Sequence, residues 1–195
     1  MSTFASFLEE SRKIRDISLK YGAYPISEEE ALIIYSVVYE RAILLKGINV
    51  VEVGSGCGYS SMWILKALKD SGYSKRSKMI LIERNPERAR FLGELIRGKR
   101  FSEFATLMVG DAKEVLKSVD IPVHIAFIDA TKDEYHIYLE LLEPNLKRGS
   151  IIFAHNFPEN FPMRMRKYAE IVMDNKRYHS VMLPTSLSLS LSVKI

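Results

Sequence analysis

Short apolar runs recur along the middle of the chain, and longer amphipathic segments separate them. The runs are four to six residues long and lie at 49–53, 79–82, 105–109, 123–128 and 150–154. Strands that are buried on both faces have this continuous apolar character, and they are typical of parallel sheets covered by helices. The alternation therefore predicts five parallel strands joined by helices.

The segments between and before these runs carry helix signals. Asn85-Pro86-Glu87 offers an N-cap residue, a proline at the first helical position and an acid in the first turn, so a helix is predicted over 86–98. Asp111 and Asp133 are placed to cap helices running to about Val119 and Lys147, with Gly149 in the turn after the second. Two more helices are predicted before the first strand, at 3–20 and 27–46.

The C-terminal region departs from this pattern. Residues 186–193 alternate strictly between serine and apolar residues, which is typical of a strand with one buried face. A second apolar run, 178–183, precedes it, and Pro184-Thr185 supply a turn. The expected fold is therefore an α/β, Rossmann-like sheet of seven mostly parallel strands, with helices on both faces and a C-terminal antiparallel hairpin. We expect one domain over 1–195, in which helices 1–46 join a core of residues 47–195.

Charge and composition narrow the functional classes. The formal net charge is +4, but residues 75–100 contain nine Lys or Arg against three Glu, so that segment carries +6 and the remainder −2. Such a segment is either a phosphate-binding surface or a solvated helix face. The single cysteine, Cys57, excludes an intramolecular disulfide framework and a cysteine-based zinc cluster. Neither a signal peptide nor a membrane-spanning run is visible, so a cytoplasmic protein is expected.

The most informative segment joins the first strand to a helix and contains three glycines, Gly54, Gly56 and Gly58. Glycines permit positive φ and a close approach of ligand to backbone, and the N–H groups of a helix start attract electronegative groups. A dinucleotide fingerprint would place its third glycine one residue later, and no phosphate-loop Gly-Lys-Ser/Thr follows. The loop thus predicts a nucleotide-like ligand of another kind at the carboxyl ends of the strands.

This segment resembles the first motif of class I S-adenosylmethionine-dependent methyltransferases, acidic-x-Gly-x-Gly-x-Gly, with Glu52 as its acid. The resemblance implies S-adenosylmethionine as the cofactor. Glu83 ends the second strand, where an acid would accept hydrogen bonds from both ribose hydroxyls, and Gly110-Asp111-Ala112 resembles the family segment beside the adenine. The residues expected to bind the cofactor are Glu52, Gly54, Ser55, Gly56, Gly58, Ser60, Glu83, Arg84, Gly110, Asp111, Ala112 and Asp129.

The fourth strand ends in Phe127-Ile128-Asp129-Ala130-Thr131-Lys132, followed by Tyr135. This segment is similar to one found in the catechol and caffeoyl-CoA type O-methyltransferases. The resemblance implies that Asp129 binds a divalent metal and that Lys132 acts as the base on the substrate hydroxyl. It also implies methyl transfer to the oxygen of a small molecule.

His155-Asn156 marks the main departure from that family, which has Asp-Asn after the fifth strand. Replacing a carboxylate by an imidazole weakens the site for magnesium, which prefers hard oxygen ligands. Three outcomes are open: manganese, zinc or iron on Asp129, His155 and Asn156; no metal, with His155 as the general base; or loss of the family's chemistry.

Two other functions stay open. An RNA methyltransferase would use the basic segment 75–100 to bind phosphates, and a non-catalytic nucleotide-binding module would lack chemistry altogether. If the protein is oligomeric, a dimer is expected. Aromatic walls for the acceptor are expected from Tyr21 and Tyr24 and from residues 157–162.

Overall fold

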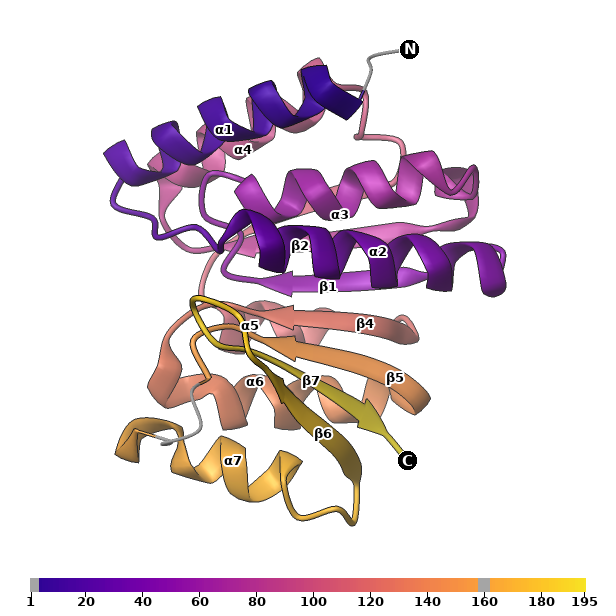
Figure 1. Ribbon diagram of the computed structural model, residues 1–195, viewed down its shortest axis with the longest axis vertical. Helices are drawn as coiled ribbons and strands as arrows, with labels where there is room; N and C mark the ends of the chain where they lie inside the picture. Colours follow the sequence, from indigo (N-terminus) through magenta and orange to yellow (C-terminus); the bar gives the residue numbers. More distant parts are fainter. Residues whose placement is uncertain (1–3, 158–161) are drawn as a thin grey trace.

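The computed structural model describes residues 4–157 and 162–195, which contain a seven-stranded sheet of order β3-β2-β1-β4-β5-β7-β6 (Figure 1). Strands β1 to β5 are parallel to one another, and β7 runs antiparallel to both β5 and β6. The expected fold class is confirmed. The strands are β1 Asn49–Val53, β2 Lys78–Glu83, β3 Ala105–Val109, β4 Val123–Ile128, β5 Leu146–Ala154, β6 Tyr178–Leu183 and β7 Leu189–Lys194.

Helices cover both faces of the sheet. One face carries α1 Phe4–Lys20, α2 Glu28–Leu44, α3 Tyr59–Asp70 and α4 Pro86–Gly98, and the other carries α5 Ala112–Val115, α6 Tyr135–Leu142 and α7 Arg166–Val172 (Figure 1). The apolar strand residues alternate between the two cores: Val50 packs in the first, and Val51 and Val53 pack in the second. Because successive residues of a central strand face one core and then the other, both sets are apolar, and this explains the continuous apolar runs.

Several predicted boundaries are wrong. The helix expected over 111–119 is α5 followed by a 3-10 turn over Leu116–Ser118, and the one expected over 133–147 is α6 between 3-10 turns at Lys132–Glu134 and Glu143–Asn145. Pro144 explains the second break, because its ring clashes with the preceding turn and it has no N–H to donate. Gly149 then lies inside β5, which starts at Leu146, and not in the turn after the helix.

The final strand also starts later than predicted. Residues before Leu189 form a turn, in which Ser188 has a φ of +66° and Leu189 N–H donates to Thr185 Oγ1 at 2.9 Å. The alternation of serine and apolar residues extends through this turn, so the pattern alone does not indicate where β7 begins. The predicted caps at Asn85 and Asp111 are present, since Asn85 accepts from Glu87 N–H and Arg88 N–H and Asp111 accepts from Lys113 N–H.

The strand order reverses between β1 and β4, and this creates the place where a ligand can bind. β1 pairs with β2 on one side and with β4 on the other. The connections from these strands therefore leave in opposite directions and open a crevice at their carboxyl ends. Among the described residues, no helix is both long and apolar enough to cross a bilayer.

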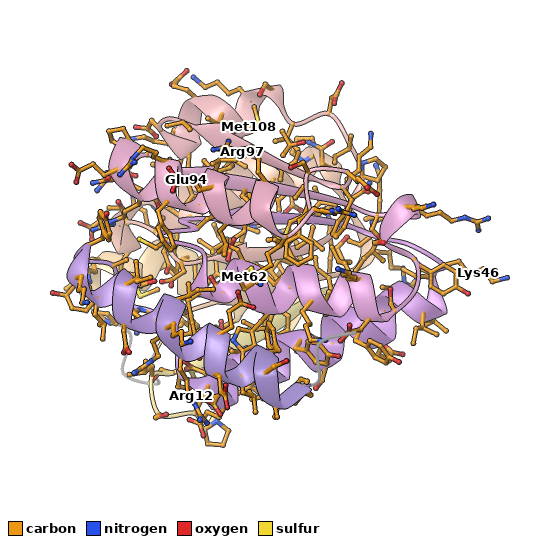
Figure 2. All side chains as sticks on the ribbon, turned by 90° about the horizontal axis from the view of Figure 1, so that it is seen from above. Arg12, Lys46, Met62, Glu94, Arg97 and Met108 are labelled. Atoms are coloured by element: carbon orange, nitrogen blue, oxygen red, sulfur yellow. The ribbon has the colours of Figure 1, made fainter. Side chains whose placement is uncertain are left out.

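The basic segment 75–100 does not form one surface beside that crevice. Lys75, Arg76 and Lys78 lie at the start of β2, whereas Arg84 follows its end. Helix α4 then runs back, so Arg97 lies at its far end, exposed with Glu94 as seen from above in Figure 2. The six residues of β2 separate the basic residues at its start from Arg84 at its end by roughly 16–20 Å. This separation argues against a single phosphate-binding face at the site.

Candidate functional site

A cavity of about 610 Å³ lies at the carboxyl edge of the sheet. This volume is within the range of small-molecule sites. Its walls come from the loop between α1 and α2, the glycine loop after β1, the ends of β2 and β3, and the segment after β4. The lining includes Ser18, Gly22, Ala23, Tyr24, Pro25, Gly54, Ser55, Gly56, Cys57, Tyr59, Ser60, Glu83, Arg84, Arg88, Gly110, Asp111, Ala112, Asp129, Lys132, Asn156 and Arg164.

The glycine loop requires glycine at two positions for different reasons. Gly54 has a φ of +90°, and a Cβ there would lie 2.2 Å from the carbonyl oxygen of Asp129. Gly58 has a φ of +95° and caps α3, and its Cβ would lie 2.6 Å from Leu92 Cδ1. Gly54 thus permits β1 and β4 to end side by side, whereas Gly58 permits α4 to pack against the loop. Gly58 does not line the cavity.

Glu52 does not line the cavity either, although it was expected to bind the cofactor. Its side chain is fully buried and accepts a hydrogen bond from Ser60 Oγ at 2.6 Å and another from Ser61 Oγ. Burial raises the pKa of Glu52, while the serine hydroxyls oppose that effect. The acid of the motif therefore anchors the first turn of α3 from beneath.

Glu83 lies beside the glycine loop at the end of β2 and is 5% exposed. One carboxylate oxygen accepts from Gly56 N–H at 2.7 Å and the other accepts from Asn85 N–H at 2.8 Å. Nearby, the buried Ser55 hydroxyl has no well-aligned hydrogen bond among the described residues, although it lies close enough to Glu52 to lower the pKa of that carboxyl. A buried hydroxyl without a well-aligned partner suits a polar ligand group.

The remaining expected cofactor residues on the far side of Glu83 line the cavity as well. Gly110, Asp111 and Ala112 follow β3, and Asp111 also caps α5 through Lys113 N–H at 2.8 Å. Arg84 lines the rim and is exposed.

Asp129 and Lys132 line the cavity on the segment after β4. Lys132 Nζ lies 2.9 Å from Asp129 Oδ1 and donates to the Tyr135 hydroxyl at 2.6 Å. Tyr135 in turn donates to the carbonyl oxygen of His155 at 3.1 Å. The lysine side chain is 13% exposed. It is therefore held in one place while its amine faces the cavity.

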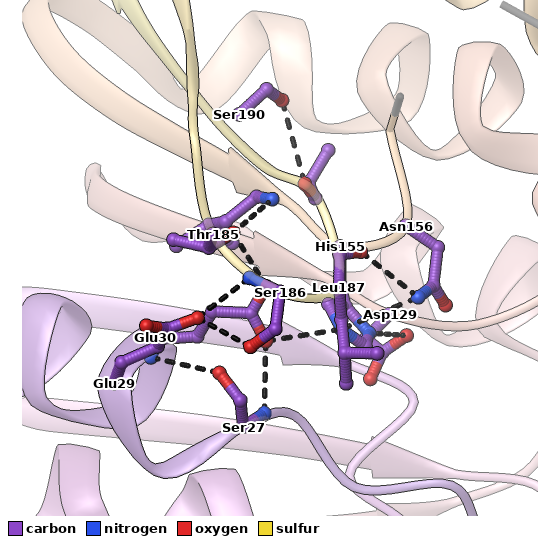
Figure 3. A network of polar contacts seen from close by, with 12 residues as sticks. Ser27, Glu29, Glu30, Asp129, His155, Asn156, Thr185, Ser186, Leu187 and Ser190 are labelled. Carbon is purple, nitrogen blue, oxygen red and sulfur yellow. Dashed lines mark hydrogen bonds and ion pairs between the residues drawn. The ribbon is translucent and has the colours of Figure 1, made fainter. Parts of the chain in front are cut away.

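His155 contacts Asp129 (Figure 3) and is not among the residues that line the cavity. Its Nδ1 is 3.1 Å from Asp129 Oδ1, and its Nε2 is 3.4 Å from Glu30 Oε2. Burial alone would lower the pKa of His155, but the two carboxylates outweigh burial and raise that pKa to about 8. Burial would raise the pKa of Asp129, but its contacts with His155 and Lys132 outweigh burial and lower that pKa.

Glu30 is the member of this cluster that sequence reasoning missed. It comes from the first turn of α2, and its side chain is fully buried. Its place three residues after Ser27 marks it as the glutamate of a capping box, which is ordinarily a helix-end role at the surface. Nothing in the local pattern indicates that its carboxylate also reaches His155.

The contacts of Asp129 and His155 do not fit a divalent metal held between them. Asp129 Oδ1 already contacts both Lys132 Nζ and His155 Nδ1. Asn156 Nδ2 lies 3.4 Å from His155 Nε2 and donates to the Leu187 carbonyl at 3.2 Å. Among the described residues, no group of three or more His, Cys, Asp and Glu side chains has the arrangement of a metal site.

The expected acceptor walls are found only in part. Tyr24 lines the cavity, whereas Tyr21 packs near Phe91 with ring centroids 6.4 Å apart. Phe157 is fully buried beside Tyr168 in the second core. Residues 158–161 lie outside the described part of the chain.

Comparisons with known proteins place this geometry in a family. Residues 51–157 match the family described as Methyltransferase domain. The catechol O-methyltransferase of Niastella koreensis is 23% identical over 156 residues, which cover 78% of this chain and 68% of that protein.

Solved structures share the fold over nearly the whole chain. An O-methyltransferase from Bacillus cereus in complex with SAH has a TM-score of 0.77 at 17% identity, covering 95% of this chain and 90% of its own. The O-methyltransferase TomG from Streptomyces achromogenes in complex with SAM has a TM-score of 0.76 at 16% identity, covering 96% and 88%. Because the family match spans more than half of the residues, the chain belongs to the methyltransferase-domain family.

Proposed function

We propose that this chain transfers a methyl group from S-adenosylmethionine to a hydroxyl oxygen of a small molecule. One observation carries the proposal: the glycine loop, Glu83 and the Asp129–Lys132 pair all line the same cavity. The names of the Niastella koreensis and Bacillus cereus proteins, and the SAH and SAM in the two solved structures, support the same reaction.

The cofactor would lie along the wall formed by the glycine loop. The buried Ser55 hydroxyl, which lines the cavity, and the N–H groups at the start of α3 suit its amino-acid part. Glu83 suits the ribose hydroxyls, because each of its oxygens accepts one backbone bond and keeps a further lone pair. Asp111 and Ala112 would lie beside the adenine. When bound, S-adenosylmethionine supplies an electrophilic methyl group.

We assign Lys132 as the general base that removes the proton from the acceptor hydroxyl. Of the two candidate bases, Lys132 lines the cavity and His155 does not. The Lys132 ammonium is paired with Asp129 in the structure, so it first releases its own proton to solvent. The neutral amine then accepts the hydroxyl proton, and the ammonium beside Asp129 is restored. The positive charge then stabilises the negative oxygen until the methyl group is transferred. Alignment of the two reactants supplies much of the rate, since proximity is worth roughly 7–11 kcal/mol.

The test is transfer of labelled methyl groups to catechol and other small phenols by the wild type and by Lys132→Met. We expect the variant to lose roughly 10²- to 10⁴-fold in kcat, which is the usual contribution of a general base. Its affinity for S-adenosylhomocysteine, measured by calorimetry, should stay within about threefold of the wild type, because the cofactor wall is unchanged.

Lys117→Met is the matched control, because Lys117 is exposed on the 3-10 turn after α5, forms an ion pair with Glu114 and does not line the cavity. Unchanged kcat in Lys132→Met would contradict the assignment of the base. Binding of NAD but not of S-adenosylhomocysteine would overturn the methyltransferase reaction and favour a nucleotide-binding module.

A further inference from the structure

The buried carboxylate of Glu30 connects helix α2 to His155 and, through His155, to Asp129. Its Oε2 accepts from Ser27 N–H at 2.8 Å, and its Oε1 accepts from Thr185 Oγ1 at 2.8 Å (Figure 3). Oε2 also lies 3.4 Å from His155 Nε2. Glu30 therefore joins three parts of the chain at one point: the start of α2, the turn between β6 and β7, and the end of β5.

His155 is held between two carboxylates, one on each ring nitrogen. Nδ1 faces Asp129 Oδ1 at 3.1 Å, and Nε2 faces Glu30 Oε2 at 3.4 Å. A neutral imidazole has one N–H, so it would leave a lone pair facing one of these oxygens. Both carboxylate contacts are favourable only if both nitrogens carry protons. The amide Nδ2 of Asn156 also lies 3.4 Å from Nε2 and would favour an unprotonated Nε2, but that amide is neutral and donates to the Leu187 carbonyl. Two carboxylates against one neutral amide point to a buried His155 cation.

This cation and Lys132 together balance the charges of Asp129 and Glu30. A divalent ion on Asp129 Oδ1 would have to displace His155 Nδ1 or Lys132 Nζ, and an ion on the other carboxylate oxygen would still lie close to two positive charges. The side chain of His155 is 2% exposed, so water can do little to screen that repulsion.

We infer that Glu30 is a positioning residue which locks His155 against Asp129, and that this histidine array stands in place of a divalent metal in this chain. The site then binds neither Mg²⁺ nor Mn²⁺, and Asp129 is aligned with Lys132 by side chains alone. The inference rests on the proposed function only for the role of Lys132.

The first experiment measures metal binding without any methyl transfer, so its failure is distinct from failure of the proposed function. Protein freed of metal by a chelator is titrated with Mn²⁺, and binding is followed by calorimetry and electron paramagnetic resonance. We expect the wild type to bind no stoichiometric Mn²⁺. His155→Asp removes the cation and adds a carboxylate beside Asp129 and Asn156. This variant should bind one Mn²⁺ per chain, at least tenfold more tightly than the wild type binds Mn²⁺.

S-adenosylhomocysteine binding reports whether each variant is folded. One Mn²⁺ per wild-type chain that disappears in Asp129→Asn would overturn the inference. A folded His155→Asp that binds Mn²⁺ no better than the wild type would overturn it too. If His155→Asp does not fold, the wild-type and Asp129→Asn titrations decide the question between them.

The second experiment isolates Glu30. Glu30→Ala should lower kcat about tenfold or more and leave KM for S-adenosylmethionine unchanged, because Asp129 and Lys132 lose their alignment while the cofactor wall is intact. Glu30→Gln should recover most of kcat, since its amide oxygen can still accept from His155 and its NH₂ can donate to Thr185 Oγ1.

Glu29→Ala is the matched control, because Glu29 bonds Ser186 of the same turn, has no contact with His155 and lies one residue away. Nuclear magnetic resonance of protein labelled with ¹⁵N-histidine reports the protonation of His155 directly. This readout does not depend on whether Glu30 merely holds α2 to the sheet. Both ring nitrogens of His155 should carry protons in the wild type. A single protonated nitrogen, or equal losses of kcat in Glu29→Ala and Glu30→Ala, would contradict the positioning role.

Discussion

Glu83 shows how one side chain can be prepared for a ligand by the backbone around it. Its two oxygens are held by the N–H groups of Gly56 and Asn85, which belong to two different loops at the cavity. The carboxylate therefore has a fixed direction before any ligand arrives, and little conformational entropy is lost on binding.

At this residue, we expect Glu83→Ala to weaken S-adenosylhomocysteine binding by roughly 10- to 100-fold, because hydrogen bonds to a charged group are worth about 1.5–3 kcal/mol. Isothermal titration calorimetry measures the change. Glu87→Ala is the control, since Glu87 is an exposed acid in the first turn of the helix that follows. An unchanged dissociation constant in Glu83→Ala would remove Glu83 from the cofactor site.

Among the elements, the loop from β1 to α3 depends most on its backbone. Gly54 N–H and Ser55 N–H both donate to the Ile82 carbonyl, at 2.9 Å and 3.0 Å, so the loop is tied to the end of β2. Glu52 holds the other end of the loop through Ser60 and Ser61. The loop is thus anchored at both ends, and Gly54 lies where it touches β4.

For this element we expect Gly54→Ala to lower the free energy of unfolding by about 2–4 kcal/mol, from the positive φ and from the overlap with the Asp129 carbonyl. Cofactor binding should fall with it. Gly98→Ala at the end of α4 meets nothing within 4 Å and should raise stability by about 0.5 kcal/mol. Urea denaturation measures both, and equal stabilities of the two variants would contradict the steric argument.

Across the whole molecule, the His155 cluster links elements that are distant in sequence. It joins α2, the ends of β4 and β5 and the β6–β7 turn, so its charge state affects how the N-terminal helices hold to the sheet (Figures 1 and 3). The pKa of His155 is about 8 in the folded chain, above the ordinary histidine value near 6.5.

Because the folded state binds this proton more tightly, the stabilisation is complete below about pH 6.5 and is lost as pH rises through about 8. A pKa difference of this size corresponds to about 2 kcal/mol. The difference in unfolding free energy between the wild type and His155→Asn, measured by urea denaturation, should shrink over that range. His124, whose pKa is lowered by burial, is present in both proteins and cancels in the comparison. Parallel pH curves for the two proteins would contradict the cation.

The fold and much of the cavity could be predicted because their signals are local. Continuous apolar runs, a glycine loop after the first strand and an acid at the end of the second follow from steric and solvation rules that act within a few residues. The carboxyl ends of parallel strands then bring Asp129, Lys132 and Asn156 to the same edge as Glu83.

The roles of Glu30, His155 and Glu52 depended instead on contacts between distant segments. The local sequence pattern is the same whether these three side chains face solvent, a ligand or each other. Glu30 has the pattern of a capping-box glutamate, His155 that of a histidine at a strand end and Glu52 that of a motif acid. The packing of α2 and the β6–β7 turn buries Glu30 against His155, and the packing of α3 turns Glu52 away from the cavity. Burial and partner choice are set by which surfaces meet, and no local pattern along the chain encodes that meeting.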